Sequence, residues 1–390
     1  MGSPRTFPAE SRLAFLKEQD ARHLRRTLSP VTMRRPGHLT AGGEEIVDFS
    51  SNDYLGLSRH PSLRRRALNA IKEHGSGSGA SRLMSGDLDL HHELERLFAE
   101  LKGKEAALLF NSGYQANVGM LQALTGRRDA IVADRLIHAS IIDGAMMSRA
   151  RLLRFNHNDT ESLAAILRDK RSDFDNVLIV TESVFSMDGD LAPLEEICRL
   201  KDQFGCELLV DEAHATGIFG PEGAGRVEQA GLGDKVEFIM GTFSKALGGF
   251  GAAVAADRAD VDYLINTARS FIYSTALPPS VVASNIAALK YCMQDKDPGK
   301  ELLAEAERLR EMLQDAGLTV RGKSQIIPVI LGGSDRTLKV GRRLLQRGYR
   351  TVPVRPPTVP EGRARLRISL CTAHTADEIN GLAEEIRDVI

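Results

Sequence analysis

Short apolar runs recur along the chain, and each is followed by a longer segment in which apolar and polar positions alternate with helical spacing. Runs of this kind occupy residues 106–110, 130–134, 176–180, 208–210 and 238–240. An apolar run of about five residues is typical of a strand that is buried on both faces, and a segment such as 91–102 is typical of a helix. Strands and helices that alternate in this way predict a mainly parallel sheet with right-handed crossovers.

The same alternation returns in the last hundred residues, after a predicted linking helix at 281–292. A helix is expected at 300–316, a strand at 326–331 and a helix at 334–348. At the other end, residues 11–26 predict an amphipathic helix that packs onto the body of the protein. We therefore expect an N-terminal segment of helix and strand at 1–54, a large domain at 55–292 and a small C-terminal α/β domain at 293–390.

Two of the apolar runs end at or near residues whose side chains can take part in catalysis. One stops at Asp211 and His214, and the other stops shortly before Lys245. In an open α/β sheet, ligands bind beyond the carboxyl ends of the strands, so both ends can face one ligand. A lysine in a loop of small residues can form a Schiff base with the aldehyde of pyridoxal phosphate, whose ring nitrogen needs an acid. Asp211 fits that acid, His214 can reach the phenolic oxygen of the ring, and Thr242 and Ser244 offer hydroxyls for a phosphate. The plain alternative is a surface lysine in a glycine-rich turn and an aspartate that caps a helix.

A second candidate phosphate site follows the run at 106–110. The segment 111–117 opens a helix, and its Gly113 and Tyr114 would present free backbone N–H groups at the positive end of the helix dipole. The glycine-rich stretch 75–79 fits neither the P-loop pattern nor the dinucleotide-binding pattern. A nucleotide-dependent oxidoreductase is therefore disfavoured.

The segment that contains Asp211 and the segment that contains Lys245 form a distinctive pair of motifs. Asp211-Glu-Ala-His-Ala-Thr-Gly217, followed by Thr242-Phe-Ser-Lys-Ala-Leu-Gly-Gly249, resembles the α-oxoamine synthases, which are pyridoxal phosphate enzymes of fold type I. The match extends from Asp48 in the N-terminal part to Pro360. It implies an α/β fold in which a large domain with a mainly parallel, seven-stranded type of sheet is joined to a small C-terminal α/β domain and an N-terminal helical segment.

The resemblance also implies a reaction. The stretch Arg355-Pro-Pro-Thr-Val-Pro360 is most like the branch of the family that condenses L-alanine with a pimeloyl thioester, carried by coenzyme A (pimeloyl-CoA) or by acyl carrier protein (pimeloyl-ACP), in biotin synthesis. Two rival reactions remain open within the family: glycine with acetyl-CoA, and serine with a long acyl chain. From a different class, a non-enzymatic α/β binding protein would keep the fold without a reactive lysine.

Several site residues are implied by the resemblance alone. His138 matches a histidine that stacks on the cofactor ring and assists proton transfer, and Ser186 matches a further ring contact. Ser274 and Thr275 match residues that reach the phosphate of the neighbouring subunit, which implies a homodimer. The positions that match substrate contacts are Arg25, with Arg26 as an alternative register, Asn52, Thr358 and, for the substrate carboxylate, Arg367.

Composition narrows the setting. With 42% hydrophobic and 26% charged residues and a net charge of −1, the chain of 390 residues is typical of a soluble globular protein without a nucleic-acid or membrane partner. Its four scattered cysteines lack the paired spacing of a metal site and indicate reduced thiols in the cytoplasm. Residues 1–5 lack the apolar core of a secretory signal and read as a cloning remnant without function.

Overall fold

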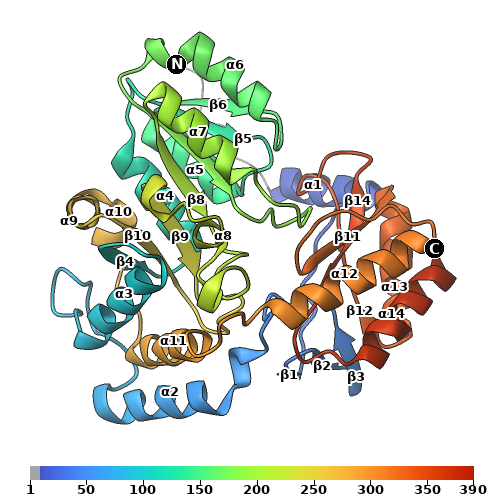
Figure 1. Cartoon of the computed structure of the whole chain (residues 1–390). Coiled ribbons are helices and arrows are strands. Elements are labelled where there is room, and N and C mark those ends of the chain that lie inside the picture. The colour runs from blue at the N-terminus through green and yellow to red at the C-terminus, as the bar shows by residue number, and fades with distance from the viewer. Residues whose placement is uncertain (1–8) are drawn as a thin grey trace.

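A seven-stranded sheet forms the centre of the larger domain in the computed structural model, which describes residues 9–390 (Figure 1). Residues 1–5, for which no function is expected, lie outside this range. The strands lie in the order β4 (Ala106–Phe110), β10 (Ala252–Ala256), β9 (Phe238–Thr242), β8 (Glu207–Asp211), β7 (Val177–Glu182), β5 (Ala130–Asp134) and β6 (Arg151–Phe155). Only β10 runs antiparallel to its neighbours among these strands, so the prediction of a mainly parallel sheet is confirmed.

Helices cover both faces of this sheet, which explains why its inner strands are apolar at nearly every position. They are α2 (Pro61–His74), α3 (Asp89–Leu101), α4 (Gly113–Leu124), α5 (Ala139–Ser148), α6 (Thr160–Lys170), α7 (Leu194–Phe204), α8 (Arg226–Gln229), α9 (Arg258–Thr267), α10 (Arg269–Ile272) and α11 (Pro279–Cys292). The predicted runs at 106–110 and 130–134 are confirmed as β4 and β5. Strand β10 begins at Ala252, directly after a turn in which Gly248 and Gly251 adopt φ values of 64° and 98°.

The smaller domain follows α11 and contains a three-stranded sheet in the order β11 (Ile326–Gly332), β14 (Ala364–Ser369) and β13 (Val352–Val354). Helices α12 (Lys300–Asp315), α13 (Ser334–Gln346) and α14 (Ala376–Val389) pack with it in one core that also contains Phe49 and Tyr54. The N-terminal strands β1 (Met33–Arg35), β2 (His38–Ala41) and β3 (Glu44–Asp48) join β12 (Tyr349–Arg350) in a further sheet. The N-terminal segment therefore lies with the smaller domain.

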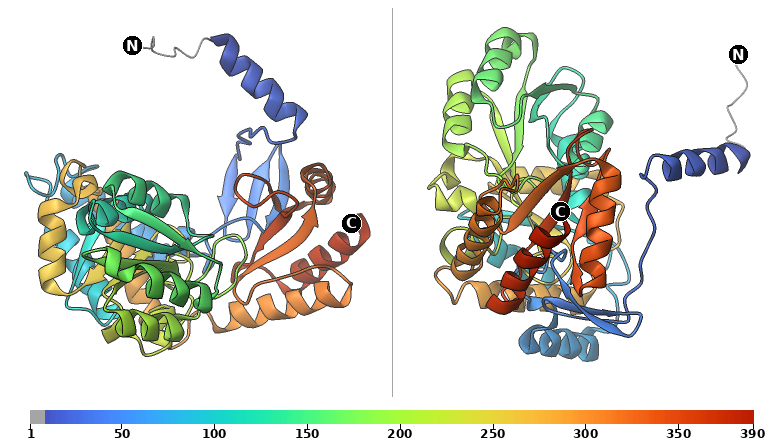
Figure 2. Two further views of the ribbon diagram at one scale, coloured as in Figure 1. Left: turned by 90° about the horizontal axis from the view of Figure 1, so that it is seen from above. Right: turned by 90° about the vertical axis from the view of Figure 1, so that its right-hand side faces the viewer.

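The first helix departs from the prediction. Helix α1 (Ala9–Ala21) ends five residues earlier than expected and projects away from both domains (Figure 2). Its apolar residues Leu13 and Phe15 are 59% and 58% exposed, so the expected packing of this helix onto the body is wrong for this chain. The segment that follows, with Arg25 and Arg26, is an extended coil.

Three parallel strands place polar side chains at one edge of the large sheet. β7 ends at Glu182, β8 at Asp211 and β9 at Thr242, and Glu182 pairs in register with Asp211. Because parallel strands share the direction of their carboxyl ends, these side chains meet at the boundary with the smaller domain.

Candidate active site

A cleft with an open volume of about 540 Å³ lies at this edge of the sheet. The predicted residues that line it are Gly113, Tyr114, His138, Asp211, His214, Thr242, Ser244 and Lys245. Segments from four different strand ends thus converge on one site. This agrees with the expectation that the two apolar runs ending at Asp211 and near Lys245 face one ligand.

The amine of Lys245 lines this cleft next to a histidine. Its Nζ lies 2.8 Å from Nε2 of His214. Burial lowers the pKa of Lys245 to about 8, although the carboxylates of Asp211 and Glu182 act in the opposite direction. A substantial fraction of the amine is therefore neutral near pH 8, and a neutral amine can act as a nucleophile or a base.

A chain of hydrogen bonds runs from this amine into the smaller domain through Tyr54, which sequence reasoning missed. His214 Nδ1 lies 2.8 Å from the hydroxyl of Tyr54, and that hydroxyl lies 3.1 Å from Oδ1 of Asn52. Burial, helped by the charge of Lys245, holds the pKa of His214 well below its usual range, so its imidazole is neutral. The consistent assignment is that Lys245 donates to Nε2, that Nδ1–H donates to Tyr54, and that Tyr54 donates to Asn52.

A second chain links the predicted acid to the predicted stacking histidine through Asn117, another residue that the sequence did not single out. Asn117 Nδ2 donates to Asp211 Oδ2 at 2.9 Å and to Ser140 Oγ at 3.0 Å. His138 Nδ1 accepts from the backbone N–H of Ser140 at 3.2 Å and lies 2.7 Å from its hydroxyl. Because Nδ1 accepts these bonds, the neutral ring carries its proton on Nε2. Asn117 lies four residues after Gly113, one helical turn into α4, and this spacing was the only sequence signal for it.

Glu182 is a second carboxyl group in the cleft. Its side chain is buried, and burial, with the nearby charge of Asp211, raises its pKa to about 8. Its Oε1 atom has no hydrogen-bond partner in the described part of the chain. The two neighbouring carboxyls differ in their surroundings: Asp211 accepts hydrogen bonds from two N–H donors, those of Asn117 and Ala213, whereas the raised pKa of Glu182 keeps that group largely protonated at neutral pH.

These features fit pyridoxal phosphate. Asp211 offers a buried carboxylate for a ring nitrogen, Lys245 offers an amine for an aldehyde, and the first N–H groups of α4, at Gly113 and Tyr114, have no acceptor within the helix. A side-chain oxygen of Asn117 is also buried in the cleft without a partner among the described residues, so it can accept a hydrogen bond from a ligand.

Arg367 reaches the site from the smaller domain. Its Nε donates to the carbonyl of Ser186 at 2.7 Å, and its Nη atoms donate to Ser369 Oγ at 2.7 Å and to the Tyr54 hydroxyl at 3.3 Å. These contacts use three of the five N–H groups of the guanidinium, so two remain for a ligand carboxylate. The neighbouring Arg365 is buried and pairs with Asp188 instead, which separates the roles of the two alternating arginines.

A second cleft, with an open volume of about 1390 Å³, meets the first one at His138. Ser186 and Thr358 line this second cleft rather than the first. Arg26 donates to Thr358 Oγ1 at 2.9 Å, whereas Arg25 pairs with Asp20. Arg26 thus lines this cleft, whereas Arg25 does not. Asn52 lines a third cleft, which includes Lys245.

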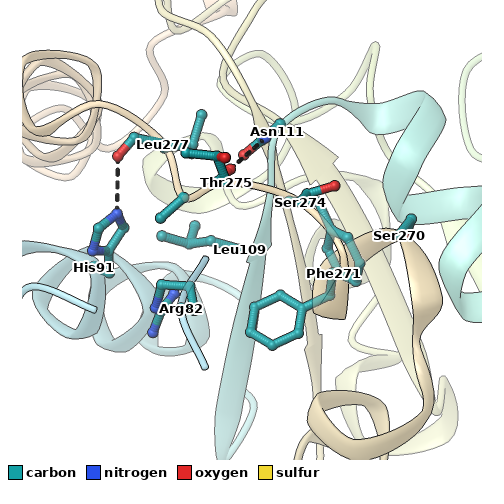
Figure 3. Close-up of a pocket in the computed structure, with 11 residues that line it drawn as sticks. Arg82, His91, Leu109, Asn111, Ser270, Phe271, Ser274, Thr275 and Leu277 are labelled. Atoms are coloured by element: carbon teal, nitrogen blue, oxygen red, sulfur yellow. Dashed lines mark hydrogen bonds between the residues drawn. The ribbon is translucent and has the colours of Figure 1, made fainter. Parts of the chain in front are cut away.

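Ser274 and Thr275 do not lie at Lys245 within this chain. They line a separate cavity beside β4, where the carbonyl of Thr275 accepts a hydrogen bond from Asn111 at 2.8 Å (Figure 3). Figure 3 also shows His91 joined to the carbonyl of Leu277 at the other side of this cavity, over a distance of 3.1 Å. The segment thus lies against the turn that leads into α4 but outside the cofactor cleft.

Other kinds of site find no support within residues 9–390. No cluster of three or more His, Cys, Asp or Glu side chains in that range is arranged to hold a metal ion. No helix in the same range is long and apolar enough to cross a membrane.

Comparisons with known proteins agree with this geometry. Residues 44–386 match the family model of aminotransferase class I and II. The 8-amino-7-oxononanoate synthase of Geotalea daltonii is 45% identical over 96% of each chain, and that of Geobacter sulfurreducens is 48% identical over 94% of each chain. A serine palmitoyltransferase from S. paucimobilis, solved with a bound PLP–myriocin aldimine, superimposes with a TM-score of 0.92 at 29% identity, covering 97% of this chain and 96% of that one. The chain therefore belongs to the aminotransferase class I and II family and, within it, to the α-oxoamine synthases, which are enzymes that depend on pyridoxal phosphate.

Proposed function

We propose that this enzyme condenses L-alanine with a pimeloyl thioester to give 8-amino-7-oxononanoate, CO₂ and the free thiol, a step of biotin synthesis. The observation that carries the proposal is that His138 lines both the cleft with Lys245 and the larger cleft with Arg26 and Thr358. An amino acid at Lys245 and an acyl group in the larger cleft would meet at this histidine. Relatives named 8-amino-7-oxononanoate synthase also share more of the sequence than the serine palmitoyltransferase does.

The larger cleft suits an acyl group that is apolar in the middle and anionic at its ends. Its walls include Ile137, Phe185 and Val359, which are buried apolar side chains, and Arg135 and Arg154 lie with Arg26 among its lining residues. A pimeloyl thioester offers a methylene chain with a terminal carboxylate, and both possible carriers add phosphate groups. Acetyl and palmitoyl thioesters lack the acyl carboxylate, so this cleft favours the pimeloyl group.

The cofactor would be held by residues of both clefts and of the α4 turn. Asp211 would face the ring nitrogen, His214 the phenolic oxygen and Ser186 the ring, with Lys245 bound to the aldehyde carbon. Gly113, Tyr114, Thr242 and Ser244 would hold the phosphate. When bound, pyridoxal phosphate takes up the electron pair that remains on a substrate carbon after a bond to that carbon breaks.

The residues of the chain then bind the amino acid and move protons. Arg367, with two free N–H groups, would bind the carboxylate of L-alanine, and Asn52 would assist it. The amine of Lys245 would remove the proton from Cα, because its lowered pKa leaves it partly neutral.

The new carbon–carbon bond forms between this Cα and the thioester carbonyl, and the thiol leaves. The Nε2–H of His138 would donate a hydrogen bond to the carbonyl oxygen as negative charge develops on it. The resulting β-keto acid loses CO₂, and a proton returned to the same carbon completes the product.

The proposal includes a homodimer in the cytoplasm. Ser274 and Thr275 lie away from Lys245 in their own subunit, which leaves them free to complete the phosphate site of a second subunit. The four cysteines are all free and buried, which suits a reducing compartment.

The decisive experiment is identification of the product by mass spectrometry from a panel of L-alanine, glycine and L-serine against pimeloyl-CoA, pimeloyl-ACP, acetyl-CoA and palmitoyl-CoA. Formation of 8-amino-7-oxononanoate from L-alanine and either pimeloyl donor alone is the expected result, and turnover of glycine with acetyl-CoA would refute the proposed substrates. Borohydride should fix the cofactor to Lys245 in the wild type and in a Lys300→Ala control, but not in Lys245→Ala. A protein without any trapped cofactor would instead be a binding protein.

A further inference from the structure

His157 lies between two carboxylates outside the cofactor cleft. Its Nδ1 is 2.9 Å from Oδ1 of Asp134, and its Nε2 is 2.7 Å from Oδ2 of Asp190. The imidazole is 23% exposed, and the side chain of Asp134 is fully buried. The edge of the ring faces Phe185, with 4.5 Å between the ring centroids and an interplanar angle of 90°. We call the three side chains of Asp134, His157 and Asp190 the histidine clamp.

The geometry fixes the charge of the ring. An ionised carboxylate only accepts hydrogen bonds, so an imidazole that contacts one carboxylate with each nitrogen must carry a proton on both. Burial alone would lower the pKa of His157, but hydrogen bonds and charges from Asp134 and Asp190 outweigh it and raise that pKa to about 10. Asp134 faces the ring from the end of β5 and Asp190 from the loop after β7, and Phe185, whose ring lies edge-on to the imidazole, carries no charge.

Asn158 completes the attachment of the same two carboxylates. It adopts a φ of 52°, in the left-handed region that asparagine tolerates best among residues with a side chain. This turn directs its backbone N–H to Asp134 Oδ2 at 2.8 Å and its side-chain amide to Asp190 Oδ2 at 3.1 Å. Two consecutive residues of the β6–α6 turn therefore hold both acids.

Each acid begins or ends a segment of the active site. Asp134 is the last residue of β5, four residues before His138. Asp190 closes the loop of residues 183–190, whose backbone folds on itself because Phe185 N–H donates to the carbonyl of Asp190 at 3.0 Å. We call residues 183–190 the bridging loop, since it also carries Ser186 at the larger cleft.

The smaller domain holds the other side of the bridging loop. Arg365 pairs with Asp188 at 2.6 Å, and Arg367 donates to the carbonyl of Ser186 at 2.7 Å. Gly189 packs so closely on β11 that an added Cβ would lie 2.1 Å from the carbonyl oxygen of Ile326. The loop is thus fastened to the smaller domain by arginines and to the large domain by the clamp.

We propose that His157, as an imidazolium between Asp134 and Asp190, is a positioning residue that holds the His138 segment and the bridging loop at a fixed separation and so shapes the cleft for the acyl thioester. Its hydrogen bonds go to Asp134 and Asp190 and not to Lys245, Asp211 or His214, so Lys245 should still bind the cofactor when His157 is replaced. The role in acyl binding rests on the function proposed above, whereas the clamp itself does not.

The test compares His157→Gln with His92→Gln in the holoenzyme. Glutamine keeps a polar side chain but is neutral and satisfies only one carboxylate. His92 is a matched control because it also lies against two acids, at 2.8 Å from Asp87 and 3.8 Å from Glu95, but its side chain is 61% exposed and lines neither the cleft with Lys245 nor the larger cleft. Steady-state kinetics, visible absorbance of the cofactor and hydrogen–deuterium exchange are measured on both variants at pH 8.

The expected result for His157→Gln is a rise of at least tenfold in KM for the acyl thioester, with an unchanged cofactor absorbance. Residues 134–138 and 183–190 should exchange at least tenfold faster than in the control. Kinetic constants and exchange equal to those of His92→Gln would overturn the proposal. Hydrogen–deuterium exchange is measured without substrate. It therefore tests whether the histidine clamp holds the two segments even if the proposed substrates are not turned over.

A measurement on the wild type covers the case in which His157→Gln does not fold. Nitrogen-15 NMR of labelled holoenzyme at pH 8.5 should show one histidine with both ring nitrogens protonated, at a pH where an ordinary histidine is neutral. That signal should be absent from Asp190→Asn. If every histidine is neutral at pH 8.5, the clamp does not exist as described.

Discussion

Removing the amine of Lys102 tests how much a buried ion pair stabilises the turn that contains Asp211 and His214. Lys102 follows α3, and its Nζ lies 2.7 Å from Oε2 of Glu212 and 2.8 Å from Oγ1 of Thr216. Both charged side chains are 0% exposed. The substitution Lys102→Met keeps much of the side-chain length and removes the charge.

The structure sets the size of the effect. Glu212 would keep one donor, the backbone N–H of Val227 at 2.9 Å, but would lose the cation that pairs with it. Breaking a buried ion pair in this way costs about 3–5 kcal/mol. The carboxyl can escape by binding a proton, which at pH 7 costs about 3.7 kcal/mol, since pH 7 lies about 2.7 units above the ordinary glutamate pKa and each unit is worth about 1.36 kcal/mol. We therefore expect a loss of about 3–4 kcal/mol in the free energy of unfolding at pH 7.

The loss should depend on pH with a definite sign. In the variant the folded-state pKa of Glu212 rises above its unfolded value, so the folded state binds the proton more tightly. The destabilisation is therefore smallest near the unfolded pKa and grows by about 1.4 kcal/mol per pH unit as the pH rises towards the new folded pKa. Between pH 5.5 and pH 7 the difference from the wild type should increase by about 2 kcal/mol.

The assay is urea unfolding of four proteins at pH 5.5 and pH 7. The double variant Lys102→Met/Glu212→Gln removes both charges and should recover most of the loss, because the glutamine amide can donate to Thr216. Lys290→Met is the control, since Lys290 pairs with Glu93 at the same distance of 2.7 Å but the two side chains are 43% and 34% exposed. That change should cost less than about 1 kcal/mol. A loss below about 1.5 kcal/mol for Lys102→Met, or one that does not change with pH, would refute the reasoning.

Three further predictions concern the cleft itself. Arg367→Lys removes the planar fork, so KM for the amino acid should rise about 10- to 100-fold with unchanged cofactor absorbance, and an unchanged KM would count against its role. Because burial raises the pKa of Glu182 to about 8, its contribution to stability is present at low pH and is lost as the pH rises through about 8. The melting temperature of the cofactor-free protein should therefore fall less between pH 5 and pH 9 in Glu182→Gln than in the wild type. An equal fall of the melting temperature in both proteins would contradict this. Tyr54→Phe deletes the hydroxyl between His214 and Arg367, so kcat/KM should fall about 10- to 100-fold while the melting temperature stays close to that of the wild type, and undiminished turnover would exclude the hydrogen-bond chain.

The sequence by itself determined the architecture of the large sheet and the position of its reactive edge. Apolar runs such as 106–110 have no polar face, so they had to be buried on both sides, and the residue at which each run stops had to lie at a strand end. Asp211 and Lys245 were found for that reason. The parallel pairing of β8 with β9, which the structure shows, brings the two residues into one cleft.

Only the tertiary structure decided which distant residues complete that cleft. Tyr54 reaches His214 across 160 positions of sequence, and Arg367 reaches Tyr54 across 313, and no local pattern records such contacts. The position of Arg26 at the larger cleft likewise depends on an extended segment in which Arg26 contacts Thr358, and helical periodicity does not record that contact. The charge of His157 is the plainest case, because a lone histidine in a turn becomes an imidazolium only when folding brings one carboxylate from the end of β5 and another from the loop after β7 to its two nitrogens.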